Sequence, residues 1–127
     1  MTKTTSPINL PNRPLSNLDL VMYANLMKIP DFRGVYMRDS LPKKISHHER
    51  GIINLDNCNG PGTHWTAYKK INNKIVYFDS FGNLRPPLEV MQYFKSNGPV
   101  KVIFNYNVYQ NFDTYNCGHL CLEFLNK

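Results

Sequence analysis

The feature that most constrains the fold is a pair of β-rich runs joined by Asn72-Asn73. The runs, HWTAYKKI and KIVYFDSF, carry the β-branched and aromatic residues typical of strands, and asparagine tolerates the positive φ angle of a tight turn. A two-residue loop fixes the register of the hairpin. Ile71 then pairs with Lys74, and Asp79 lies opposite Thr66.

This register brings a histidine and a carboxylate to one face of the hairpin. Side chains alternate along a strand, so His64 shares a face with Thr66 and is the diagonal neighbour of Asp79. Diagonal neighbours lie roughly 7–8 Å apart at the backbone, within reach of a carboxylate and an imidazole. We therefore expect His64 and Asp79 to interact, although an ordinary cross-strand polar pair would have the same placement.

The C-terminal stretch QNFDTYNCGHLCLEFL carries a helical stripe. Four of its residues recur at i, i+3, i+4 and i+7, the spacing of one buried helix face: Cys117, Leu120, Cys121 and Phe124. Cys117 then lies in the first turn of a core helix, where peptide dipoles and free N–H groups stabilise a thiolate, and Gly118 leaves space beside the sulfur. Cys117 is a candidate nucleophile with His64 as its base, or else a small buried hydrophobe.

The remaining segments predict the element order α, β, β-hairpin, α, β, α. Ser16-Asn17 caps a helix that ends before Pro30, and its apolar face is expected to be Leu18, Val21, Met22 and Leu26. FRGVYMRDSL is expected to be a strand or an irregular edge, GIINLD a strand, and KKISHHERG between them a charged surface loop. Arg85-Pro86-Pro87 opens a second helix, LEVMQYFKSNG, and VKVIFNYNVY is a further strand. The predicted fold class is α+β, a central antiparallel sheet with a buried C-terminal helix that carries the cysteine.

Composition narrows the class of protein. A chain of 127 residues predicts a single domain, 1–127, in which the proline-containing residues 1–15 form an extended N-terminal arm. No apolar run reaches membrane-spanning length, the N-terminus MTKTTSPINL lacks the apolar core of a signal peptide, and three cysteines favour reduced thiols, so we expect an intracellular protein without membrane contact. The net charge of +6 suits nucleic acid or simple solubility equally well, because the Lys and Arg residues are dispersed along the sequence.

Two groups of residues raise the question of a metal site. The pair His47-His48 has no third ligand nearby in the sequence. Cys117, His119 and Cys121 offer zinc donors, but His119 is rotated away from the face that the thiols share. The missing ligands would have to come from Cys58 or the histidine pair. We therefore expect no metal and no cofactor.

Three stretches in combination resemble a known family: GTHWTAYKK, YFDSFG, and a glutamine separated by six residues from CGHLCLEFL. They are similar to the adenain type of cysteine protease and, more distantly, to the ubiquitin-like-protein proteases. As a whole, the chain resembles the small adenain-like proteases of virus-like DNA elements such as Polintons and adintoviruses. The resemblance implies a circularly permuted papain-like fold.

The resemblance also implies a set of catalytic residues. His64 would be the base, and Asp79 would orient it, as an Asp does in the ubiquitin-like-protein proteases where adenain has Glu. Cys117 would be the nucleophile. Gln110 matches the adenain spacing for the side-chain amide of the oxyanion hole, and Asn111, at the shorter spacing of the deconjugating relatives, is the alternative.

The implied function is a cysteine endopeptidase that cleaves viral or virus-like capsid or core precursors. We expect a monomer in the host cytoplasm or nucleus, or packaged in the virion. Adenain is activated by a viral peptide through a disulfide and by DNA, so both are candidate activators, with Cys58 as the thiol placed for such a bond. Adenain also continues through further helices beyond the position of Lys127, which leaves the extent of the substrate cleft open.

Two alternative functions stay open. One is a deconjugase that acts on a ubiquitin-like modifier. The other is a non-catalytic, basic nucleic-acid-binding domain in which Cys117 is inert.

Overall fold

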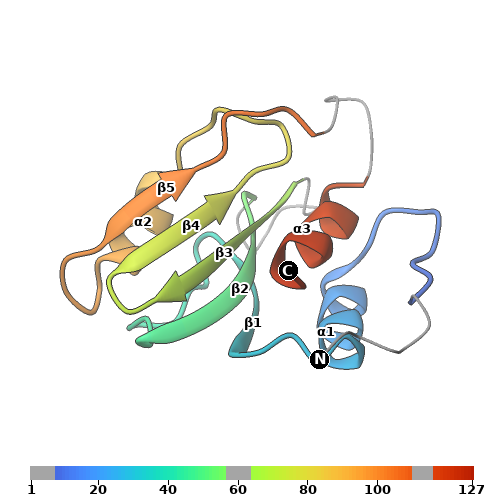
Figure 1. The fold of residues 1–127 in the computed structure, drawn as a ribbon, viewed down its shortest axis with the longest axis horizontal. Coiled ribbons are helices and arrows are strands. Elements are labelled where there is room, and N and C mark those ends of the chain that lie inside the picture. The colour runs from blue at the N-terminus through green and yellow to red at the C-terminus, as the bar shows by residue number, and fades with distance from the viewer. Residues whose placement is uncertain (1–7, 57–63, 110–115) are drawn as a thin grey trace.

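The computed structural model describes residues 8–56, 64–109 and 116–127, and residues 1–7 of the predicted arm lie outside this part. This part contains three helices and five strands, and four of the strands follow one another between α1 and α2 (Figure 1). Their bounds are α1 Asn17–Leu26, β1 Phe32–Met37, β2 His48–Asn54, β3 Trp65–Ile71, β4 Lys74–Phe78, α2 Leu88–Phe94, β5 Lys101–Phe104 and α3 Cys117–Leu125.

The strands form one sheet in the order β1-β2-β3-β4-β5. The inner pairs, β2–β3 and β3–β4, are antiparallel, whereas the outer pairs, β1–β2 and β4–β5, are parallel. The α+β class with a C-terminal helix is confirmed, but the sheet is mixed, so the prediction of an antiparallel sheet holds for the inner pairs and is wrong for the outer ones. Parallel neighbours need a crossover connection. Helix α2 provides it between β4 and β5, and residues 38–47 provide it between β1 and β2.

The predicted register of the central hairpin is confirmed. Ile71 pairs with Lys74, and the ladder continues to Ala67 opposite Phe78. Asn72 has a φ angle of 55°, the positive value that the tight turn requires. Because β3 begins one residue after His64 and β4 ends one residue before Asp79, both residues lie at the same end of the hairpin.

Helices cover both faces of the sheet (Figure 1). On one face, α1 and α3 pack over Ile52, Trp65, Ala67 and Phe78. On the other face, α2 packs over residues that alternate with these in the strands, Ile53, Tyr68, Ile75 and Tyr77. The buried stripe of α3 is centred one residue later than predicted, on Gly118, Cys121, Leu122 and Leu125, with Cys117 at its edge. The alternation of the strands therefore supports two separate cores.

Helix α1 has the predicted start but a different buried face. Its first turn is a capping box, in which the Ser16 hydroxyl accepts from the Asp19 N–H at 3.1 Å and the Asp19 carboxylate accepts from the Ser16 N–H at 2.9 Å. The predicted apolar face is exposed: Leu18, Val21, Met22 and Leu26. The core instead receives a second stripe of the same period: Leu20, Tyr23, Ala24 and Met27. Both stripes fit a helix, so periodicity could not choose between them.

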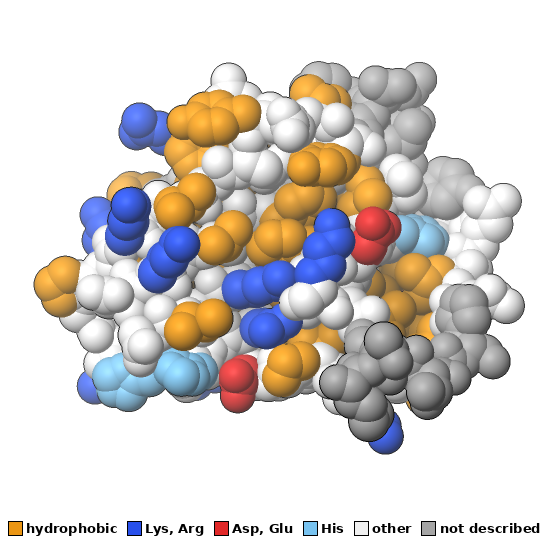
Figure 2. All heavy atoms as spheres, in the orientation of Figure 1, with side chains coloured by type: hydrophobic (Ala, Val, Ile, Leu, Met, Phe, Trp, Pro, Cys, Tyr) orange, Lys and Arg blue, Asp and Glu red, His pale blue; other side chains and the backbone are white. Residues whose placement is uncertain are grey.

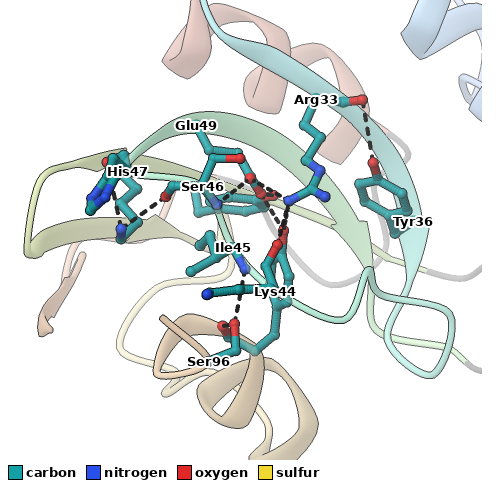
Figure 3. Close-up of polar contacts among 11 residues, drawn as sticks. Arg33, Tyr36, Lys44, Ile45, Ser46, His47, Glu49 and Ser96 are labelled. Carbon is teal, nitrogen blue, oxygen red and sulfur yellow. Dashed lines mark hydrogen bonds and ion pairs between the residues drawn. The ribbon is translucent and has the colours of Figure 1, made fainter. Parts of the chain in front are cut away.

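The stretch KKISHHERG, residues 43–51, is not the predicted surface loop, because its second half forms the start of β2. Ile45 is buried, and Glu49 is 1% exposed although it is charged. The Glu49 carboxylate accepts hydrogen bonds from Arg33 at 2.9 Å and the Ser46 N–H at 3.0 Å (Figure 3), and from the hydroxyls of two tyrosines, Tyr68 and Tyr93. Burial raises the pKa of Glu49, but these donors outweigh it and hold the pKa below its usual range. A carboxylate whose oxygens are all hydrogen-bonded can therefore be buried beside the core that lies between α2 and the sheet.

Basic residues that are dispersed in the sequence gather on the sheet face beyond α3. The register places Arg50 beside Lys69 and Lys74 beside Lys101. Figure 2 shows Lys and Arg side chains interspersed with hydrophobic ones over this face. Burial, and then the charges of Arg50 and Lys127, lower the pKa of Lys69. In the described part of the chain, no helix has the length and apolar character needed to span a membrane.

Two neighbouring tyrosines allow a matched test of the Glu49 network. Tyr68 and Tyr77 are cross-strand partners and both are fully buried, but within the described residues only the Tyr68 hydroxyl has a hydrogen-bond partner. Tyr68→Phe removes a donor from a buried carboxylate and should lower the free energy of unfolding by about 1–3 kcal/mol. Tyr77→Phe should leave it unchanged or raise it slightly. Urea unfolding of the two variants gives the comparison, and equal losses would contradict it.

Candidate active site

The structure brings His64 and Asp79 together at the end of the hairpin. Nε2 of His64 lies 2.7 Å from Oδ1 of Asp79, and both residues are buried. A carboxylate can only accept, so Nε2 carries the shared proton. The basic nitrogen of a neutral ring is then Nδ1. Nδ1 is itself buried and has no hydrogen-bond partner among the described residues.

The Asp79 carboxylate is held by its own turn. Oδ1 also accepts from the backbone N–H of Phe81 at 3.0 Å, while Oδ2 is buried and receives no hydrogen bond from the described residues. Phe81 in addition stacks on the His64 ring, with centroids 4.0 Å apart and planes inclined by 5°. An aromatic face favours the positively charged form of the imidazole. Phe81 was not among the predicted site residues, although YFDSF places an aromatic residue two positions after Asp79.

Cys117 is the first residue of α3 and is 7% exposed. Its sulfur accepts a hydrogen bond from the backbone N–H of Trp65 at 3.4 Å. Trp65 is the neighbour of His64 in sequence, so this bond ties the cysteine directly to the start of β3. The three predicted residues His64, Asp79 and Cys117 are thus assembled where the hairpin meets the helix.

Electrostatics favour the charged forms of both reacting groups. Burial raises the pKa of Cys117, but the interaction with His64 and hydrogen bonds from the N–H groups of Trp65 and Gly118 outweigh it, and the pKa is lowered. Burial lowers the pKa of His64, but the bond to Asp79 and the interaction with Cys117 raise it to about 9. The contact of Nδ1 with the sulfur does not meet hydrogen-bond geometry here, so proton transfer between them requires a closer approach.

Gly118 permits close packing beside the cysteine. A Cβ atom at this position would lie 3.3 Å from side-chain atoms of Leu15 and Leu20 and 3.4 Å from the Trp65 ring. The space beside Gly118 is therefore filled, not open as the sequence analysis expected. The indole of Trp65 donates to the Leu15 carbonyl at 3.0 Å, so the N-terminal segment packs against the site.

The other predicted residues fall into two groups. Gln110, Asn111 and Cys58 lie outside the described residues. Cys121 is fully buried in the core, and burial raises the pKa of its thiol well above the usual value, as expected for a structural residue. The His119 ring lies 2.8 Å from the Pro11 carbonyl, and in the described parts of the chain no three His, Cys, Asp or Glu side chains are grouped to hold a metal ion.

No family model and no curated protein sequence matches this chain. The assignment of the site to a reaction class therefore depends on its geometry and on the sequence resemblance described above.

The two pKa shifts predict how the thiol reacts with pH. Thiolate and imidazolium coexist above the pKa of Cys117 and below the value of about 9 for His64. The rate of alkylation by iodoacetamide should therefore rise with a midpoint below that of a free thiol, whose pKa is about 8.5. Asp79→Asn should move this midpoint upward, because a neutral amide no longer stabilises the imidazolium that stabilises the thiolate.

The Cys117→Ala variant measures the background from the remaining thiols. A wild-type midpoint at the free-thiol value would contradict the ion pair.

Proposed function

We propose that this protein is a cysteine endopeptidase of the adenain type. Cys117 is the nucleophile and His64 is its general base. Asp79 holds the imidazole in the productive tautomer, and Gln110 is the side-chain donor to the oxyanion.

The observation that carries this proposal is the placement of the imidazole between a carboxylate and a thiol. Nε2 of His64 is bonded to the buried Asp79, so Nδ1 is the nitrogen left for Cys117. The interaction between the imidazole and the sulfur raises the pKa of His64 and lowers the pKa of the Cys117 thiol. A small buried hydrophobe or an ordinary cross-strand pair would not need this coupling between β3, β4 and α3.

The residues of the proposed site can be assigned to the steps of acyl transfer. The Cys117 thiolate attacks the scissile carbonyl, and backbone N–H groups at the start of α3 stabilise the oxyanion together with Gln110. The imidazolium of His64 gives its proton to the departing amine, which leaves an acyl-enzyme. His64 then takes a proton from water, whose attack on the thioester releases the second product and regenerates the thiol.

The natural substrate is proposed from the resemblance. It is a viral or virus-like capsid or core precursor, cleaved in the host cytoplasm or nucleus or inside the virion. The same proposal includes that the enzyme is a monomer and that a peptide or DNA is its candidate activator. The basic sheet face formed by Arg50, Lys69, Lys74 and Lys101 is where we expect DNA to bind if it is an activator.

A peptide carrying a thiol-reactive electrophile provides the test. The wild-type protein should form one covalent adduct, and Cys117→Ala should form none. Asp79→Asn should label about a hundredfold more slowly, in line with the usual contribution of general acid–base catalysis. Cys121→Ala is the matched control and should label at the wild-type rate, because Cys121 lies in the core.

Two further reagents separate the alternatives. A ubiquitin-like modifier with a C-terminal electrophile should not react, and rapid adduct formation would identify a deconjugase instead. Labelling of Cys117→Ala at the wild-type rate, combined with salt-dependent binding of an oligonucleotide, would replace the protease by a non-catalytic nucleic-acid-binding domain.

A further inference from the structure

The carboxylate of the site is held by a residue from another part of the chain. We propose that Asn105, which directly follows β5, is a positioning residue that fixes the Asp79 turn and, through it, the His64 ring. This inference rests on the proposed function, since it assigns Asn105 a role in the same site.

Both backbone groups of Asp79 are bonded to one side chain. Oδ1 of Asn105 accepts from the Asp79 N–H at 2.9 Å, and Nδ2 of Asn105 donates to the Asp79 carbonyl at 2.7 Å. The paired ladder of β4 and β5 ends at Tyr77 and Phe104. The Asn105 amide therefore replaces a strand at the point where the ladder stops, and it holds Asp79 by its backbone.

Asparagine suits this position because of its particular set of donors and acceptors. The second hydrogen of Nδ2 donates to the Asn107 carbonyl at 3.0 Å, so Oδ1 and both hydrogens of the amide nitrogen are in use. Aspartate lacks the donors, and serine has a single hydroxyl that cannot span both backbone groups. Glutamine has the same amide on a longer stem. No other residue type offers this combination at the same reach.

The hold of the Asn105 side chain on the Asp79 backbone acts as a clamp, and backbone hydrogen bonds of the segment after β5 add to it. The Asn105 carbonyl accepts from the Asn83 N–H at 2.8 Å, and the Tyr109 N–H donates to the Ser80 carbonyl at 2.8 Å. Gly82 has a φ angle of 82°, and a Cβ atom there would lie 2.6 Å from the Asn107 carbonyl oxygen. The turn that follows Asp79 thus lies directly against the segment that follows β5.

Asn105 influences the position of the His64 ring through two residues of the turn. The Asp79 carboxylate bonds to Nε2 of the ring, and the Phe81 ring stacks on its face. Both residues belong to the turn that Asn105 holds. A displacement of about 1 Å in a reacting group can cost on the order of a hundredfold in rate, so a clamp outside the site can control the reaction.

Among the residues that the structure describes, the titratable groups that interact with His64 and Asp79 can be named. His64 interacts with Asp79 and Cys117, and Asp79 also influences the buried groups Tyr77 and Cys121. Burial raises the pKa of both Tyr77 and Cys121, so they stay neutral through the neutral range. A change in the His64 titration after substitution of Asn105, a neutral residue, therefore reports on position and not on a new charge.

The first experiment measures amide hydrogen exchange in the wild-type protein and in Asn105→Ala. The Asp79 amide should exchange slowly in the wild type, and this protection should be lost in Asn105→Ala while the Ile75 amide keeps its protection. Fast exchange at Asp79 in the wild type would overturn the proposal. This measurement on the wild type stands even where Asn105→Ala fails to fold, and Asn105→Ser then serves as the milder variant.

The second experiment follows His64 by its NMR titration and Cys117 by the pH profile of alkylation. In Asn105→Ala, the His64 pKa should fall toward its ordinary value, and alkylation at neutral pH should slow by about tenfold or more. In Asn105→Ser, the His64 pKa and the alkylation rate should lie between those of Asn105→Ala and those of the wild type. A purely structural role would lower the melting temperature but leave both titrations at their wild-type positions, and that result would overturn the proposal.

The control is the same substitution at another half-buried asparagine, Asn97→Ala. Asn97 lines a cavity with Asn72 and Asn73, at the turn end of the hairpin and so at the opposite end from His64. Asn97→Ala should leave the His64 titration and the pH profile of Cys117 alkylation unchanged. If the wild-type protein itself shows ordinary pKa values for His64 and Cys117, the proposed function fails. If it shows the shifted values and Asn105→Ala retains them, only the role of Asn105 fails.

Discussion

The structure depends on the register of one antiparallel hairpin. A two-residue turn at Asn72-Asn73 aligns β3 with β4 from Ala67 opposite Phe78 to Ile71 opposite Lys74, and side-chain alternation then directs the buried residues of the two strands into two separate cores. The same alignment brings the residues just outside the ladder, His64 and Asp79, within hydrogen-bond distance. A slip by one residue would turn the strand's side chains to the opposite face and separate this pair as well. Folding and assembly of the site thus have a common origin.

The elements that sequence predicted well are those set by local chemistry. The hairpin, the capped start of α1 and the helix beginning at Cys117 each follow from a turn, a cap or a period within a short stretch. The placement of His64 beside Asp79 could be predicted for the same reason. The approach of Cys117 to this pair could not be worked out from spacing, because it depends on how α3 packs on β3. There the expectation came from the base that a nucleophilic cysteine needs and from the resemblance.

What sequence could not predict was decided by long-range competition. Two stripes on α1 had the same period, and packing against β1 and α3 selected the one that contains Ala24. The charged segment around Glu49 looked solvated because its partners, Arg33, Tyr68 and Tyr93, are distant in sequence. The parallel pairing of the outer strands likewise depends on crossovers that leave no local pattern. The roles of Phe81 and Asn105 could not be predicted, because both depend on contacts that form only when the turn around Asp79 is folded.

Trp65 joins two properties that are usually separate. Its backbone N–H bonds to the Cys117 sulfur, while its indole ring lies in the first core and bonds to the Leu15 carbonyl. The ring therefore sets the position of the backbone group that contacts the thiol. Selection for a better-packed core at this residue is at the same time selection on the environment of the sulfur. Neither property can evolve independently at Trp65.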